Sequence, residues 1–120
     1  MNAKELNELL ETAEITTIPG EYEFRKPIKR IELSDGNSLS VQASETHYCA
    51  PRENHGPWDL VEVGFPSVEP PETWAEYFDG DWDNDDRTGS VYGYVPIDLV
   101  VDFINEHGGM ANANNSIQNN

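Results

Sequence analysis

Eight carboxylates lie between residues 69 and 86, and the first basic residue after them is Arg87. They belong to a chain of 120 residues with a net charge of -16. Like charges at such close spacing repel one another and oppose the compact state, so any fold must leave them at the surface. The run therefore calls for an explanation outside folding: a cation, a basic partner or a saline medium.

Composition favours one small folded domain with a modest core. Only 37% of the residues are hydrophobic, but three Trp, five Tyr and four Phe supply bulky apolar side chains. We expect a single compact domain over residues 1–109, followed by a disordered Asn-rich tail over residues 110–120.

Cellular location and partner class follow from the cysteine count and the charge. Cys49 is the only cysteine, so no intrachain disulfide can form, which fits a reducing compartment. No apolar stretch approaches the ~20 residues of a membrane span, and the N-terminus lacks the apolar core of a signal peptide. The acidity disfavours direct binding to nucleic acid or an anionic membrane. We therefore expect a cytoplasmic protein whose partners are basic proteins or cations.

Hydrophobic periodicity predicts an α+β fold. An amphipathic helix begins after Asn2, where Glu5 completes a capping box, and a second helix runs from Pro96 to about His107. Alternating apolar segments separated by turn residues predict strands at residues 15–18, 22–24, 31–33, 39–43, 58–65 and 91–95. We expect an antiparallel sheet of about five strands, flanked by an N-terminal and a C-terminal helix.

The alternating aspartates of residues 79–85 invite a calcium interpretation, because hard cations bind several carboxylate oxygens together. The pattern departs from an EF-hand at two decisive positions. When the loop starts at residue 79, Asn84 replaces the glycine at position six and Ser90 replaces the glutamate at position twelve. A calcium loop of another kind stays open, and we assign no metal site.

A second interpretation of the acidic run is a surface that competes with nucleic acid for a basic groove. Duplex DNA carries one negative charge per about 1.7 Å of axis, and Trp and Tyr are favoured anchors at interfaces. The candidate partner-binding residues are Glu69, Glu72, Glu76, Asp79, Asp81, Asp83, Asp85 and Asp86, with the aromatic residues Trp74, Tyr77 and Trp82. The alternative for the aromatics is that a short helix over residues 71–78 packs them onto the sheet. A halophilic host is a third interpretation of the acidity.

A second cluster of chemically active side chains precedes Trp58. Loop His, Tyr and Arg residues beside a Trp suit a nucleotide-like ligand, with Arg on phosphate and the aromatics on the base. The candidate ligand-binding residues are His47, Tyr48, Arg52 and Trp58. Zinc is a weaker interpretation because no second cysteine is present. The plainer one buries Cys49 as a small hydrophobe.

Several short motifs carry a resemblance over residues 38–109. They are Ser40-Val41-Gln42-Ala43-Ser44, His47-Tyr48-Cys49-x-Pro51-Arg52, Gly56-Pro57-Trp58, Val61-Glu62-Val63-Gly64-Phe65-Pro66-Ser67, Val91-Tyr92-Gly93-Tyr94-Val95-Pro96 and His107-Gly108-Gly109. In these the chain resembles a group of small acidic proteins encoded by bacteriophages. The resemblance brings no activity, fold or catalytic residue. It implies expression in a bacterial cytoplasm, where such proteins often disable host machinery.

These observations lead to one main hypothesis and two alternatives. We expect a non-enzymatic phage protein that inhibits a host defence or nucleic-acid-handling protein by binding its basic surface. The alternatives are a module that sequesters a nucleotide-like signal, and a structural or assembly protein of the virion. No nucleophile–base pair, paired acids or phosphate loop is recognisable, so we assign no catalytic residue and no cofactor. The basic cluster of residues 25–30 balances the acidity within the fold or across a homodimer contact.

Overall fold

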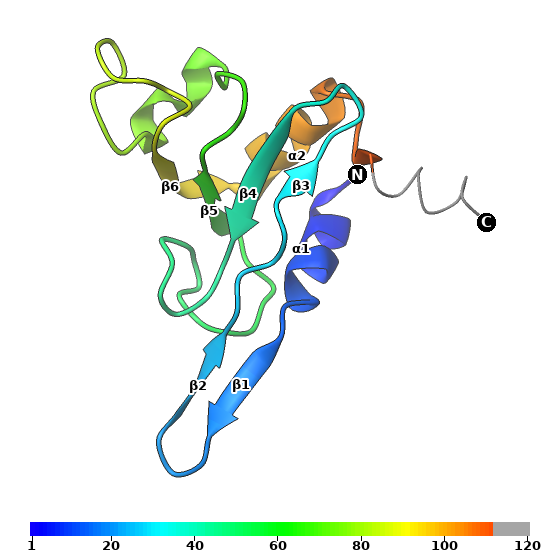
Figure 1. Ribbon diagram of the computed structural model, residues 1–120, viewed down its shortest axis with the longest axis vertical. Helices are drawn as coiled ribbons and strands as arrows, with labels where there is room; N and C mark the ends of the chain where they lie inside the picture. The colour runs from blue at the N-terminus through cyan, green and yellow to red at the C-terminus, as the bar shows by residue number, and fades with distance from the viewer. Residues whose placement is uncertain (112–120) are drawn as a thin grey trace, which may run out of the picture.

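The computed structural model describes residues 1–111. Within them, the order of elements is α1 (Ala3–Glu11), β1 (Ile15–Ile18), β2 (Tyr22–Arg25), β3 (Ile31–Glu32), β4 (Ser38–Gln42), β5 (Leu60–Gly64), the 3₁₀ helix η1 (Glu72–Tyr77), β6 (Val91–Pro96) and α2 (Ile97–Glu106) (Figure 1). All strand pairs are antiparallel. The predicted α+β class with a helix at each end is confirmed.

The strands divide between two sheets rather than forming one. β1 pairs with β2, and β3-β4-β5-β6 form a four-stranded sheet, so residues 1–111 contain six strands where about five were expected. Pro27 explains the division, because proline has no N–H to continue a ladder after β2. The next residue, Ile28, bonds through its N–H and C=O to the side chain of Gln42 at 2.9 and 3.0 Å.

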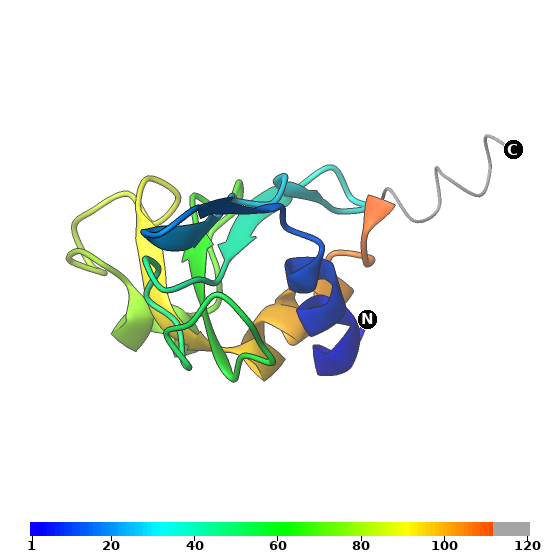
Figure 2. The same cartoon turned by 90° about the horizontal axis from the view of Figure 1, so that it is seen from below.

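The two α-helices cover one face of the four-stranded sheet (Figure 2). The residues of β4 alternate between buried and half-buried positions, as expected for a strand with one face on the core. The core joins the inward side chains of the sheet to the apolar stripes of the helices: Leu39, Val41, Val61, Val63 and Val95 pack with Leu6, Leu10, Val100 and Ile104. Within residues 1–111, neither α1 nor α2 has the length and apolar character needed to cross a membrane.

The C-terminal end of the described chain extends the fold beyond the expected boundary. Gly108 and Gly109 have positive φ angles of 88° and 81°, and the Gly109 N–H closes α2 by bonding to the Ile104 carbonyl at 2.9 Å. Met110, expected in the disordered tail, instead bridges to Leu33 and packs on the core. The rest of the predicted tail, residues 112–120, lies outside the described part of the chain.

Candidate functional site

The acidic segment, residues 69–87, connects the neighbouring strands β5 and β6 and forms one end of the molecule (Figure 1). η1 opens the segment and lies against β6, and a loop without regular structure follows it. All eight candidate carboxylates are exposed. The fold thus gathers them on a single connection at the edge of the sheet.

Hydrogen bonds within the loop hold its backbone. Asp81 accepts from the N–H of Asp83 at 3.0 Å and from the side-chain amide of Asn84 at 2.7 Å, while Asp85 accepts from the N–H of Asp81 at 2.8 Å. The Asn84 amide, and then the Asp83 N–H, lower the pKa of the Asp81 carboxyl. The carboxylates therefore stabilise the turn that carries them, as Asx turns do.

A second turn, at Asp86, is likewise held by hydrogen bonds to an aspartate side chain. Asp86 accepts from both the hydroxyl and the N–H of Thr88, at 2.7 and 2.9 Å. These two bonds lower the pKa of the Asp86 carboxyl, with the hydroxyl as the larger cause. The two turns give the loop a defined shape through its own hydrogen bonds.

Arg87 fastens the acidic segment to the core. Its guanidinium lies 4.1 Å from the centre of the Trp82 ring, its Nε donates to the Trp82 carbonyl at 2.7 Å, and its Nη1 is 3.0 Å from Glu69 Oε1. Trp82 in turn meets Phe78 edge-on, with ring centres 5.7 Å apart. The carbonyl of Arg87 accepts from the hydroxyl of Tyr92 at 2.7 Å, and burial raises the pKa of Tyr92 to about 12.

The prediction that Trp74 is an aromatic anchor for a partner is wrong. Trp74 is 1% exposed and packs in the core against Tyr92 and Phe103, with ring centres 5.5 and 5.4 Å away. An indole buried between η1, β6 and α2 cannot reach a partner, so Trp74 belongs to the helix-packing alternative instead. Tyr77 and Trp82 are half-buried and keep an accessible face.

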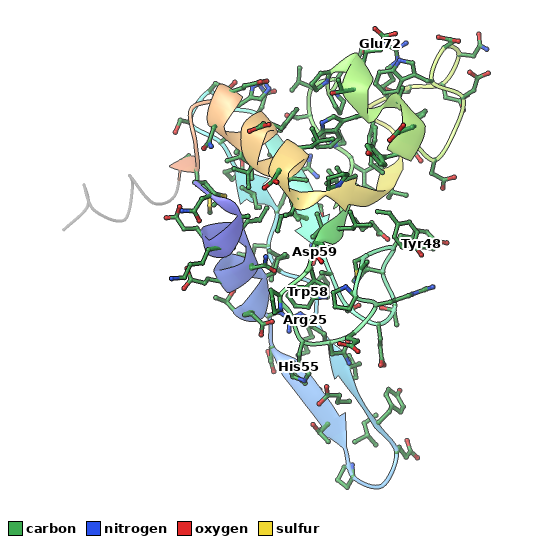
Figure 3. The ribbon with its side chains drawn as sticks, turned by 180° about the vertical axis from the view of Figure 1, so that it is seen from behind. Arg25, Tyr48, His55, Trp58, Asp59 and Glu72 are labelled. Carbon is green, nitrogen blue, oxygen red and sulfur yellow. The ribbon has the colours of Figure 1, made fainter. Side chains whose placement is uncertain are left out.

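The candidate ligand loop does not converge on one site. Trp58 is 1% exposed and lies against α1 beside Arg25, whereas Tyr48 stands on the outer side of its loop (Figure 3). The Trp58 N–H donates to Asn7 Oδ1 at 2.7 Å, and its indole N–H donates to the Glu53 carbonyl at 3.2 Å. The expectation that Trp58 stacks on a ligand base is therefore wrong, because α1 and Arg25 cover its ring.

The other residues of that loop serve mainly local structure. His47 Nδ1 is 2.6 Å from the Ser44 hydroxyl, and burial lowers the pKa of the imidazole. Cys49 is buried, as its plainer interpretation predicted, and burial raises the pKa of its thiol. Arg52 Nε donates to the Glu45 carbonyl at 3.1 Å. No group of three or more His, Cys, Asp or Glu side chains in residues 1–111 is arranged to hold a metal ion.

Two functional candidates were missed by the sequence analysis: Tyr94 and Glu62. Strict alternation along β6 would place Tyr94 on the same face as Tyr92, which is fully buried, yet Tyr94 is 42% exposed. The signal that could have found it is Gly93, because glycine within a strand often marks a bulge. Glu62 carried no sequence signal beyond its place in a strand.

Comparison with protein-family models, with curated proteins and with solved structures finds no match to this chain. The resemblance to small acidic phage proteins therefore stays a prediction.

Proposed function

We propose that this chain is a non-enzymatic binding protein whose acidic segment occupies a basic surface of another protein. The carrying observation is that eight exposed carboxylates sit on a segment held by its own hydrogen bonds and by the contact of Arg87 with Trp82. A segment that is already ordered loses little conformational entropy on binding. Less of the electrostatic attraction is therefore offset by the cost of ordering the segment.

The sign and distribution of charge select the partner class. Within residues 53–111 Arg87 is the one Lys or Arg, and it is paired with Glu69. Such a field repels phosphates and draws a positively charged surface in at an enhanced rate. Basic protein surfaces that normally hold nucleic acid have this complementarity, which supports a competitive role resembling that of a nucleic acid.

The biological setting completes the proposal. A phage-encoded protein acting in the bacterial cytoplasm would meet host defence and nucleic-acid-handling proteins, whose binding surfaces are basic. Blocking such a surface needs no catalytic group. Sequestration of a nucleotide-like signal has less support, because Trp58, one of its two candidate stacking residues, is buried.

Affinity purification from a bacterial lysate tests the proposal, with two triple variants of equal charge change. The segment variant is Glu72→Gln, Asp83→Asn and Asp85→Asn; the control, on α2, is Asp98→Asn, Asp102→Asn and Glu106→Gln. All six positions are exposed. We expect wild type to capture a basic protein at low salt and release it at high salt.

The two variants should differ in how much of the captured protein they retain. We expect the segment variant to lose the captured protein and the α2 variant to keep it, because only the segment presents the complementary surface. Equal loss of the captured protein in both variants would show that binding depends on the net charge of the chain and not on the position of the acidic segment. Failure of wild type to recover any basic protein at low salt would overturn the proposal.

A further inference from the structure

A hollow of about 320 Å³ opens beside the acidic segment. Its walls include three tyrosines, Tyr48, Tyr77 and Tyr94, and two carboxylates of the segment, Glu76 and Asp79. Its volume is at the small end of the range for ligand sites, about 300–1,000 Å³. Aromatic faces and carboxylates together form the environment that a cationic head group prefers.

A β-bulge places Tyr94 at this hollow. Val61 pairs with Val95 and Val63 with Tyr92, so two residues of β6, Gly93 and Tyr94, oppose one residue of β5. Tyr94 has a φ of 56°, in the left-handed region that costs about 1–2 kcal/mol for a bulky residue. This strained conformation does not serve to pack the core, because it turns the Tyr94 ring outward, where the residue is 42% exposed.

Glu62, the residue opposite the bulge, holds the backbone of Tyr48, and Tyr48 bonds in turn to Tyr94. Its Oε2 accepts from the Tyr48 N–H at 2.9 Å, and the Tyr48 carbonyl accepts from the Tyr94 N–H at 2.9 Å. The two rings lie 5.8 Å apart at 38°. Gly93 allows this approach, because a Cβ there would lie 3.1 Å from Cβ of Tyr48. The rings are thus held in place through the backbone before any ligand arrives.

Within the molecule, the Tyr48 ring already makes a cation–π contact with an arginine side chain. The guanidinium of Arg52 lies 5.6 Å from the centre of that ring. On the other wall, Glu76 and Asp79 are exposed, and the adjacent Glu76 carboxylate raises the pKa of Tyr77. A guanidinium can both stack on tyrosine and bond to a carboxylate with its planar fork, which an ammonium cannot do as well.

We propose that the Tyr48–Tyr94 hollow binds an arginine side chain of the basic partner, as the specific contact beside a general electrostatic surface. This inference rests on the proposed function for its partner. Its chemistry is separate, however: aromatic stacking plus two carboxylates, rather than charge alone. It can therefore fail while the proposed function stands.

An NMR titration with N-acetyl-argininamide tests the site directly, with N-acetyl-citrullinamide as the uncharged isostere. We expect saturable shifts of the Tyr48, Tyr77 and Tyr94 ring signals with the arginine probe, and binding at least tenfold weaker with the citrulline probe. The lysine probe N-acetyl-lysinamide should bind less tightly than arginine. Equal binding of the arginine and citrulline probes would overturn the proposal, as would shifts confined to the carboxylates of residues 81–86, which lie outside the hollow.

Tyr94→Gly separates binding from folding, because glycine adopts a positive φ without strain. We expect the relieved strain to offset the lost Tyr48 ring contact and the entropic cost of glycine, so that the melting temperature stays within a few degrees while the affinity for the arginine probe falls at least tenfold. Tyr22→Ala is the matched control, since Tyr22 is exposed on β2 and lines no part of the hollow. Unchanged probe affinity in Tyr94→Gly would refute the site.

The lysate capture distinguishes the arginine site from the general acidic surface. Capture that is lost in the segment triple variant but fully retained in Tyr94→Gly would keep the proposed function and remove the arginine site. Capture lost in both, with direct probe binding also lost in Tyr94→Gly, supports both.

Discussion

The guanidinium of Arg25 lies 4.9 Å from the centre of the Trp58 ring, and both side chains are buried. Arg25 ends β2, and it donates to the carbonyl of Leu10 in α1 and to the carbonyl of Asn54. One side chain therefore joins the β1–β2 hairpin, the N-terminal helix and the loop before β5. Figure 3 shows Arg25 and Trp58 side by side next to α1.

Removing that guanidinium should destabilise the protein strongly. Arg25→Ala removes a donor from two buried carbonyls, of which that of Leu10 keeps the Ala13 N–H at 3.2 Å, and it uncovers the Trp58 ring, at an expected cost of about 3 kcal/mol. Lys29→Ala removes the same charge from an exposed position and should change the free energy of unfolding by less than about 0.5 kcal/mol. Urea denaturation measures both, and similar losses would show that charge, not burial, matters.

Arg87→Ala should loosen the acidic segment. It removes the contact with the Trp82 ring and the partner of Glu69, at a cost of about 1–2 kcal/mol. Because the carboxylates then repel one another without a counter-charge, the loss should shrink at high salt. Hydrogen exchange should accelerate over residues 79–90 and not in α1. Uniform acceleration, or a loss independent of salt, would contradict the assigned role.

The pKa values of Asp81 and Asp86 should reveal the hydrogen bonds that hold the two turns of the acidic segment. The native pKa values of Asp81 and Asp86 lie below the ordinary value of about 3.9. Their contribution to stability is therefore complete above that value and is lost as the pH falls through the lowered native values. Thr88→Val should raise the pKa of Asp86 alone, and Asn84→Ala that of Asp81 alone. Carboxyl NMR titration measures both, and midpoints that do not move would contradict these contacts.

Trp74 should prove to be a core residue. Trp74→Ala removes a ring packed against Tyr92 and Phe103 and should cost about 3–5 kcal/mol. The milder Trp74→Phe should stay folded and capture the partner as wild type does, because the side chain is 1% exposed. A selective loss of capture in a fully folded Trp74→Phe would restore its role as an anchor.

Local patterns were enough to predict most of the helices and strands. The capping box at Asn2 and Glu5 forms as expected, with bonds of 2.8 and 2.9 Å. α2 begins directly after Pro96 and ends at the two glycines. These features depend on residues a few positions apart, so their signal is complete in the sequence. The exposure of the eight carboxylates was predictable too, because burying an unpaired charge is too costly.

Which aromatic residue faces solvent was decided only by tertiary structure. Trp58, Trp74 and Trp82 all lie in or beside irregular segments, yet two are buried and one is held at the edge by Arg87. Their burial depends on α1, α2 and β6, which are distant in the chain. Tyr94 faces outward because a bulge breaks the period-two alternation of β6. The sequence by itself thus determined the fold class and the exposed acidic segment. Only the packing of distant elements decided where that segment is anchored and which tyrosines stand beside it.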